Sequence, residues 1–166
     1  MTEVPQKYFP VSWEELHRHG KALAWRLNDL GPWQGIIAIT RGGLVPAAIV
    51  ARELDIRLIE TACIIGYRSE PASGMVPEAK VVKPAAVTGD GAGWLVIDDL
   101  ADTGRTAEIL RRQFPKAHFA TVYVKPQGRP QVDTFITEVS QDTWIYFPWD
   151  IDLQFAQPIA ARRQKP

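Results

Sequence analysis

Cysteine and histidine are scarce in this chain. Cys63 is the one cysteine among 166 residues, so no disulfide can form within the chain. A chain without disulfides suits a reducing compartment, and we expect a cytoplasmic protein. Cys63 lies in an apolar run, where it can be a buried bystander or a catalytic thiol. The three histidines, His17, His19 and His118, do not have the spacing of metal ligands, which disfavours a zinc-type site.

Net charge and long apolar runs are absent as well. Nineteen Lys and Arg residues balance nineteen Asp and Glu residues, so no overall field attracts nucleic acid or a membrane surface. No apolar run approaches the roughly 20 residues that a membrane-spanning helix needs. The polar start, Met1 to Glu3, is unlike a signal peptide. We therefore expect no nucleic-acid partner, and no basic amphipathic helix supports peripheral association with the inner membrane.

The length of the chain fits one domain, residues 1–166. Within this domain, strand-like and helix-like segments alternate. A capping box at Ser12 and Glu15 begins the first predicted helix, which stops at Gly31 and Pro32. Continuous apolar runs predict buried strands at 35–40, 58–65, 93–98 and 118–125, and further helices are predicted at 44–54 and from about 103–106 to 114. This order is typical of an α/β fold with a mostly parallel central sheet flanked by helices. Residues 66–92 predict a long loop, which in a compact domain is usually functional or disordered.

The most informative segment is 95–107, which reads LVIDDLADTGRTA. An apolar strand ends in two carboxylates, Asp98 and Asp99, and a third, Asp102, precedes a turn of small residues, 103–106, that begins a helix. The N–H groups and dipole of a helix start favour phosphate, and paired carboxylates suit sugar hydroxyls or Mg²⁺. The simpler alternatives are solvated turn acids, an Asp102 that only initiates the helix, and a Thr103 that only caps it.

Two other predicted strands end in polar residues. Arg41 and Gly42 follow the strand at 35–40, and Lys125 ends the strand at 118–125. Ligands of parallel sheets bind beyond the carboxyl ends of the strands, so we expect these residues to meet the acidic turn at one edge. Arg41 and Gly42 can bind an anion or form only a turn, and Lys125 can bind a ligand carbonyl or be merely exposed. No Walker motif and no complete G-x-G-x-x-G is present.

Residues 96–106 resemble the phosphoribosyl diphosphate (PRPP) signature of type I phosphoribosyltransferases. Supporting similarity covers nearly the whole chain and lies in residues 33–38, 41–46, 51–54, 125–130, 141–145 and 148–150. The resemblance implies the type I phosphoribosyltransferase fold with a flexible hood loop at about 66–92. A C-terminal base-binding segment at about 126–155 narrows it to the branch that acts on 6-oxo purines.

The resemblance implies purine salvage: Mg²⁺-dependent transfer of the 5-phosphoribosyl group from PRPP to N9 of guanine, xanthine or hypoxanthine, with release of pyrophosphate. Asp98, Asp99 and Asp102 are the implied catalytic residues, and Asp99 the implied metal ligand. Lys125 is similar to the family residue that donates a hydrogen bond to the purine 6-oxygen. Trp144 is similar to the family residue that stacks on the purine ring, and Ile145 is similar to the residue whose backbone groups bind the 2-position of the purine. The implied PRPP-binding residues are Arg41, Gly42, Asp98, Asp99, Leu100, Ala101, Asp102, Thr103, Gly104, Arg105 and Thr106, and the implied purine-binding residues are Asp102, Lys125, Trp144 and Ile145.

The chain departs from the family pattern at a few positions. Arg105 stands where this branch commonly has glycine. The hood loop begins with Gly66 in place of serine and carries Pro77 near the position of an arginine that contacts PRPP. Arg68 and Lys80 are the candidates to replace that arginine.

Two other functions compete with the salvage enzyme. A PRPP-sensing regulator that binds RNA or DNA should have a basic face or an added segment, which zero net charge disfavours. A transferase for another base is disfavoured by Lys125 and Trp144. The resemblance also implies a homotetramer.

Overall fold

The computed structural model describes residues 7–66 and 79–151. Its elements in chain order are β1 (Lys7–Pro10), α1 (Trp13–Asn28), β2 (Gly35–Thr40), α2 (Leu44–Glu53), β3 (Ile59–Ile65), β4 (Lys80–Lys83), β5 (Trp94–Ala101), α3 (Arg105–Gln113), β6 (His118–Val124), the 3₁₀ turn η1 (Arg129–Gln131), β7 (Thr134–Glu138) and β8 (Thr143–Tyr146).

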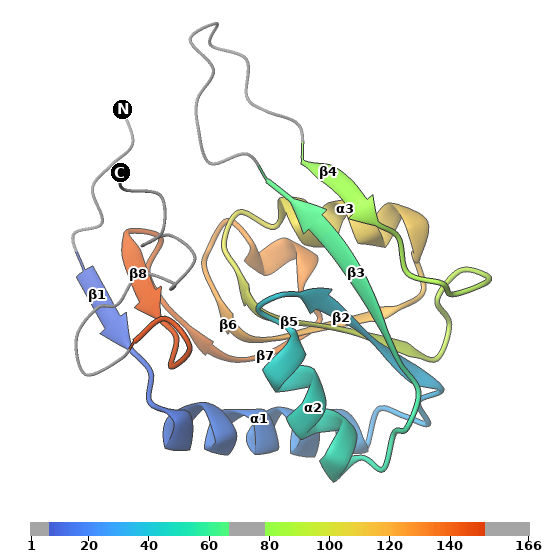
Figure 1. Ribbon diagram of the computed structural model, residues 1–166, viewed down its shortest axis with the longest axis horizontal. Helices are drawn as coiled ribbons and strands as arrows, with labels where there is room; N and C mark the ends of the chain where they lie inside the picture. The colour runs from blue at the N-terminus through green and yellow to red at the C-terminus, as the bar shows by residue number, and fades with distance from the viewer. Residues whose placement is uncertain (1–6, 67–78, 152–166) are drawn as a thin grey trace, which may run out of the picture.

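Six strands form the main sheet, in the order β4-β3-β2-β5-β6-β7 (Figure 1). All neighbours in it are parallel except β4, which runs antiparallel to β3 at the edge. The predicted α/β class with a mostly parallel sheet is therefore confirmed. β2, β5 and β6 lie side by side within the sheet, which brings their carboxyl ends to the same edge.

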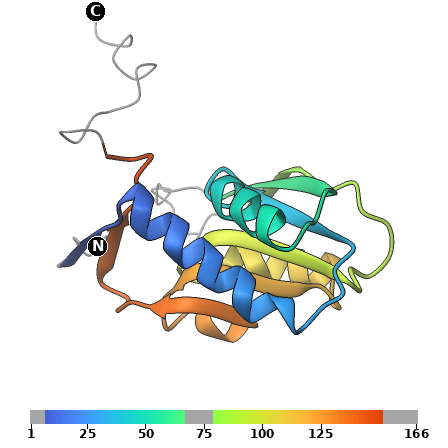
Figure 2. The same ribbon diagram turned by 90° about the horizontal axis from the view of Figure 1, so that it is seen from below.

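Helices cover both faces of this sheet (Figures 1 and 2). Successive strand residues point to opposite faces. In β2, Ile36 and Ala38 belong to the core shared with α1 and α2, whereas Ile37 and Ile39 belong to the core shared with α3. A strand buried on both faces needs apolar residues at every position, which is why β2 is a continuous apolar run.

A small parallel pair, β1 with β8, lies to one side of the main sheet (Figures 1 and 2). Ile145 of β8 is 6% exposed and belongs to the core, while Trp144 beside it is 40% exposed. The pair therefore anchors the C-terminal part of the described chain and leaves the indole of Trp144 partly accessible.

Most of the predicted boundaries agree with the structure. Ser12 is the N-cap of α1, and its hydroxyl accepts a hydrogen bond from the Glu15 N–H at 3.1 Å. β5 is longer than predicted, because its ladder with β6 continues beyond Asp98 to Ala101. The predicted loop 66–92 contains a strand, β4, because the backbone of 80–83 pairs with β3. Lys80 begins this strand, whereas Arg68 and Pro77 lie outside the described residues.

Candidate active site

Three loops meet at the carboxyl edge of the sheet. Arg41 and Gly42 follow β2, Asp102 follows β5, and Lys125 follows β6. These strands are parallel neighbours, so the predicted convergence of their ends is confirmed.

The turn after β2 lies directly against Asp99. A Cβ atom added to Gly42 would stand 2.3 Å from Asp99 Oδ2, and one added to Gly43 would stand 2.3 Å from the carbonyl oxygen of Ile97. Both distances are far below van der Waals contact, so only glycine lets this turn approach β5 so closely. The side chain of Arg41 is exposed at the same turn, and the peptide bond before it is cis.

The two carboxyl groups of β5 are adjacent acids in a partly buried position. Asp98 Oδ1 accepts from the Asp99 N–H at 2.9 Å, and Asp99 Oδ1 accepts from the Leu100 N–H at 2.7 Å. Burial, reinforced by the charge of Asp99, raises the pKa of Asp98 well above its usual range, and burial also raises the pKa of Asp99. No ion pair joins either carboxylate to a Lys or Arg within 7–66 and 79–151. The alternative of two solvated turn acids is wrong, because both residues are partly buried strand residues.

The raised pKa of Asp98 predicts that Asp98→Asn stabilises the ligand-free protein at neutral pH. The folded state holds the Asp98 proton to a higher pH than the unfolded chain does. The protonated Asp98 carboxyl therefore contributes fully to the free energy of unfolding below the unfolded-state pKa of about 3.9. This contribution is lost as the pH rises through the folded-state pKa of Asp98. We expect Asp98→Asn to raise Tm at pH 7 by a few degrees, since 1 kcal/mol corresponds to about 2–4 °C in a domain of this size.

Calorimetry between pH 4 and pH 8 measures this effect. The matched control is Asp55→Asn, because the Asp55 side chain is 90% exposed and lies far along the chain from β5. An Asp98→Asn protein with the Tm of the control throughout this range would contradict the prediction.

The turn from β5 into α3 leaves the start of the helix without a side-chain cap. Its N-cap residue is Gly104, which has a φ of 81° and no side-chain hydrogen bond. The alternative that Thr103 only caps the helix is wrong, since no cap bond from its hydroxyl is present in the described chain. The free N–H groups and dipole of α3 are suited to bind a phosphate.

A cavity of about 120 Å³ lies at this turn. Among its walls is Thr121 of β6, which is 4% exposed and whose hydroxyl has no hydrogen-bond partner among the described residues. Buried polar groups normally have a partner, so a polar ligand or water suits this cavity. Eight residues of the predicted PRPP site line the cavity: Asp98, Leu100, Ala101, Asp102, Thr103, Gly104, Arg105 and Thr106.

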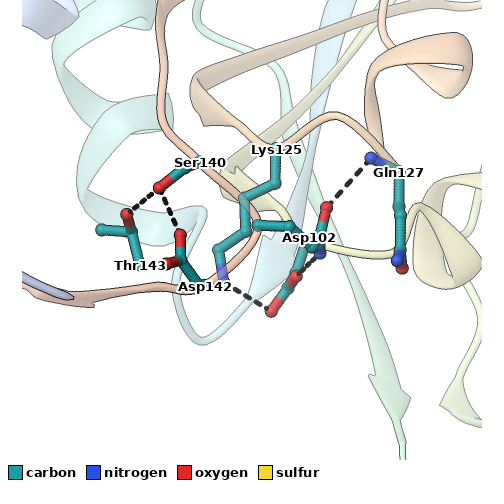
Figure 3. A network of polar contacts seen from close by, with 7 residues as sticks. Asp102, Lys125, Gln127, Ser140, Asp142 and Thr143 are labelled. Atoms are coloured by element: carbon teal, nitrogen blue, oxygen red, sulfur yellow. Dashed lines mark hydrogen bonds and ion pairs between the residues drawn. The ribbon is translucent and has the colours of Figure 1, made fainter. Parts of the chain in front are cut away.

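Asp102 is the centre of a polar network (Figure 3). Lys125 Nζ lies 3.1 Å from Asp102 Oδ2, and the Lys125 side chain is 7% exposed whereas that of Asp102 is 51% exposed. Gln141 Nε2 donates to Asp102 Oδ1 at 2.7 Å, and the backbone N–H of Gln127 donates to Gln141 Oε1 at 3.0 Å. A merely exposed Lys125 is therefore excluded. Asp102 is more than a helix-initiating acid, because its partners come from other loops than the turn into α3.

Sequence reasoning misses Gln141. The residue belongs to the segment 141–145 that resembles the family, and its place three positions before Trp144 is the one signal that could have found it. The loop that carries it is tied together by Ser140, whose hydroxyl bonds to Asp142 Oδ1 at 2.5 Å and to Thr143 Oγ1 at 2.7 Å (Figure 3). The contacts of Trp144 and Ile145 with a base stay predictions.

Comparison with known proteins agrees with this geometry. Residues 12–156 match the family described as the phosphoribosyl transferase domain, and the chain belongs to the phosphoribosyltransferase family. The predicted family, fold and enzyme class are confirmed.

Within this family, the chain is similar over nearly its full length to curated xanthine-guanine phosphoribosyltransferases. It is 60% identical to that of Desulfotalea psychrophila over 165 residues, which cover 99% of this chain and 100% of the relative. It is also 60% identical to that of Nitratidesulfovibrio vulgaris over 160 residues, which cover 96% and 95%. The crystal structure of a purine phosphoribosyltransferase from Pyrococcus horikoshii matches with a TM-score of 0.72 at 26% identity, covering 87% of this chain and 94% of that chain.

Proposed function

We propose that this chain is a purine salvage enzyme that transfers the 5-phosphoribosyl group of PRPP to N9 of guanine, xanthine or hypoxanthine and releases pyrophosphate. The main support is the ion pair between Asp102 and Lys125 beside the uncapped start of α3. An acid that can take a proton from a ring nitrogen lies next to a cation that can donate to the 6-oxygen. Both lie next to a turn suited to phosphate.

The parts of PRPP divide among the three loops. Arg41 and Gly42 bind the pyrophosphate, since a guanidinium and a closely approaching backbone suit a diphosphate. Asp98 and Asp99 accept hydrogen bonds from the ribose hydroxyls. Residues 102–106 bind the 5′-phosphate through the N–H groups of the helix start and two threonine hydroxyls.

The acidic pair also fits Mg²⁺, with Asp99 as the protein ligand. Mg²⁺ takes one or two carboxylates and completes its shell with phosphate oxygens and water. A larger cluster is not needed for such an ion, and the described residues contain no group of three or more His, Cys, Asp and Glu that could hold a metal. Asp99 lies against Gly42, so the Asp99 carboxylate is beside the turn after β2 that we propose binds pyrophosphate. When bound, Mg²⁺ neutralises negative charge on the departing pyrophosphate.

The transfer needs alignment and charge stabilisation, and no nucleophile from the protein. A bond forms between N9 and C1 of the ribose while the bond between C1 and the pyrophosphate oxygen breaks, and its electron pair leaves with pyrophosphate. C1 becomes positively charged on the way, and the carboxylates of Asp98 and Asp99 stabilise this charge. The carboxylate of Asp102 accepts the N7 proton of the base, which releases an electron pair through the ring to N9.

Lys125 selects purines that carry an oxygen at position 6. Its ammonium group can only donate, so it pairs with a carbonyl oxygen and opposes the amino group of adenine. Trp144 stacks on the ring, and the backbone of Ile145 binds the 2-position.

Nucleotide formation from Mg²⁺-PRPP and each of guanine, xanthine, hypoxanthine and adenine tests this proposal. We expect turnover with at least one 6-oxo purine and negligible turnover with adenine. No turnover with any 6-oxo purine would overturn the enzyme proposal, and PRPP binding without turnover would favour the PRPP-sensing regulator. Adenine turnover comparable to that of guanine would overturn the role of Lys125.

We expect Gly42→Ala to raise the KM for PRPP by about tenfold or more, since the displaced carboxylate loses charge-assisted contacts that are each worth about 1.5–3 kcal/mol. The new methyl group would have to push the Asp99 carboxylate away from a contact of 2.3 Å. Steady-state kinetics with PRPP varied at saturating guanine measures the change. Gly66→Ala is the control, because a Cβ there meets nothing within 4 Å; an equal KM in both variants would contradict the contact between this turn and the PRPP site.

We further propose that the protein is a cytoplasmic homotetramer. The main support is the family resemblance, and large apolar side chains that subunit contacts can bury are exposed on the single chain, among them Tyr8 at 58%, Trp13 at 56% and Trp25 at 76%. Within 7–66 and 79–151, no helix combines the length and apolarity needed to cross a membrane. Light scattering should give four times the chain mass of 18.6 kDa, and a monomer mass would contradict the assembly.

A further inference from the structure

The side chain of Gln141 connects two loops of the proposed base site. It lies between β7 and β8, directly before the strand that carries Trp144 and Ile145. Its Nε2 donates to Asp102 Oδ1 at 2.7 Å, across 39 positions of sequence, and its Oε1 accepts from the Gln127 N–H at 3.0 Å.

These two partners allow one orientation of the Gln141 amide. A backbone N–H can only donate and an ionised carboxylate can only accept, so Oε1 must face Gln127 and Nε2 must face Asp102. The amide is therefore a fixed donor to Oδ1, and its own position is set by the loop that follows β6.

The two partners of Asp102 differ in what the reaction requires of them. Lys125 binds Oδ2, but it is also the proposed donor to the purine 6-oxygen, so a bound base attracts it away from the carboxylate. Gln141 has no proposed contact with the base and can stay on Oδ1 throughout. Asp102 is 51% exposed and stands on a turn, so without this donor its carboxylate is free to rotate.

We propose that Gln141 is a positioning residue for proton transfer: it holds Oδ1 of Asp102 so that Oδ2 faces N7 of the purine when Lys125 moves to the 6-oxygen. This inference rests on the proposed function. The N7 proton passes to Oδ2, the N–H electron pair shifts through the ring, N9 bonds to C1, and pyrophosphate leaves with the electron pair of the broken C1–O bond. The Gln141 bond is charge-assisted, because its acceptor is the carboxylate of Asp102.

Gln141→Leu tests the proposal, because it keeps the bulk of the side chain and removes both hydrogen bonds. We expect kcat to fall about tenfold, which corresponds to about 1.4 kcal/mol, while the KM for PRPP stays within about twofold. We expect this fall in kcat to persist at saturating PRPP and guanine, since the lost hydrogen bonds hold the proton acceptor and do not contact PRPP. The matched control is Gln113→Leu, an exposed glutamine at the end of α3, which should behave as the unaltered protein.

A double-mutant cycle with Asp102→Asn separates positioning from a merely structural role. We expect Gln141→Leu to have no further effect on kcat once Asp102 is asparagine, because the proton acceptor is already lost. Equal effects in both backgrounds, or raised KM values for both substrates with an unchanged kcat, would overturn the proposal. Gln141→Asn, which keeps the amide but is too short to reach both partners, should give the same result and replaces Gln141→Leu if that variant does not fold.

The outcome also distinguishes this inference from the proposed function. An unaltered protein that forms no nucleotide from any 6-oxo purine overturns both. An active unaltered protein with a Gln141→Leu variant that matches Gln113→Leu overturns the positioning role alone.

Discussion

Asp102→Asn should lower kcat with guanine by about 10²- to 10⁴-fold, the contribution typical of a general base. An asparagine amide preserves the size of the side chain but cannot accept the N7 proton. In the proposed site PRPP binds through the backbone of the turn and through other loops, so its affinity should stay within about threefold of the original. Single-turnover kinetics with preformed PRPP complex, together with PRPP titration by calorimetry, measures the two quantities separately.

Asp55→Asn is the control for this substitution, since the same chemical change falls on a side chain that is 90% exposed. Asp55 has a φ of 51°, a conformation that asparagine tolerates well, so its fold should be unaffected. An Asp102→Asn enzyme with an unchanged kcat would remove Asp102 from proton transfer and leave it as a binding residue.

Lys125→Met should lower kcat/KM for guanine, xanthine and hypoxanthine by about 10²-fold, because a hydrogen bond to a charged group is worth about 1.5–3 kcal/mol. The loss should be smaller for adenine, which does not offer an acceptor at position 6, so selectivity against adenine should fall. Methionine suits this position as a replacement, because the lysine side chain is 7% exposed and its stem is packed. Competition between guanine and adenine for limiting PRPP measures the change in selectivity.

Lys21→Met removes a cation from α1 and is the control, since the Lys21 side chain is 46% exposed and pairs only with Glu53 in the described part of the chain. Equal losses for guanine and adenine in Lys125→Met would show that Lys125 supports the site without reading the 6-position.

Local sequence was enough to predict most of the fold. β2 is recognisable because a strand covered on both faces must be apolar at every position. α1 begins where predicted because its Ser12 cap is a contact between residues three positions apart. β4 was missed because its four residues are all exposed, and only pairing with β3 makes them a strand.

The candidate site was predictable in part for the same reason. One predicted strand leads directly into Asp98, Asp99 and Asp102. The carboxyl ends of neighbouring parallel strands always lie at the same edge of the sheet, where ligands bind. The contact between Gly42 and Asp99 and the bond between Gln141 and Asp102 were not predictable, because each joins residues far apart in sequence.

The sequence by itself therefore determined the order of strands and helices, the apolar faces, and the acidic turn that begins α3, since each depends on residues close along the chain. Tertiary structure alone decided that the buried Lys125 side chain pairs with Asp102 and that Gln141 donates a hydrogen bond to the other oxygen of Asp102. It also decided that Asp98 and Asp99 are partly buried without an ion pair to a Lys or Arg in the described chain. Burial and hydrogen-bond geometry arise only when separate strands pack side by side, and the chemistry of this site depends on both.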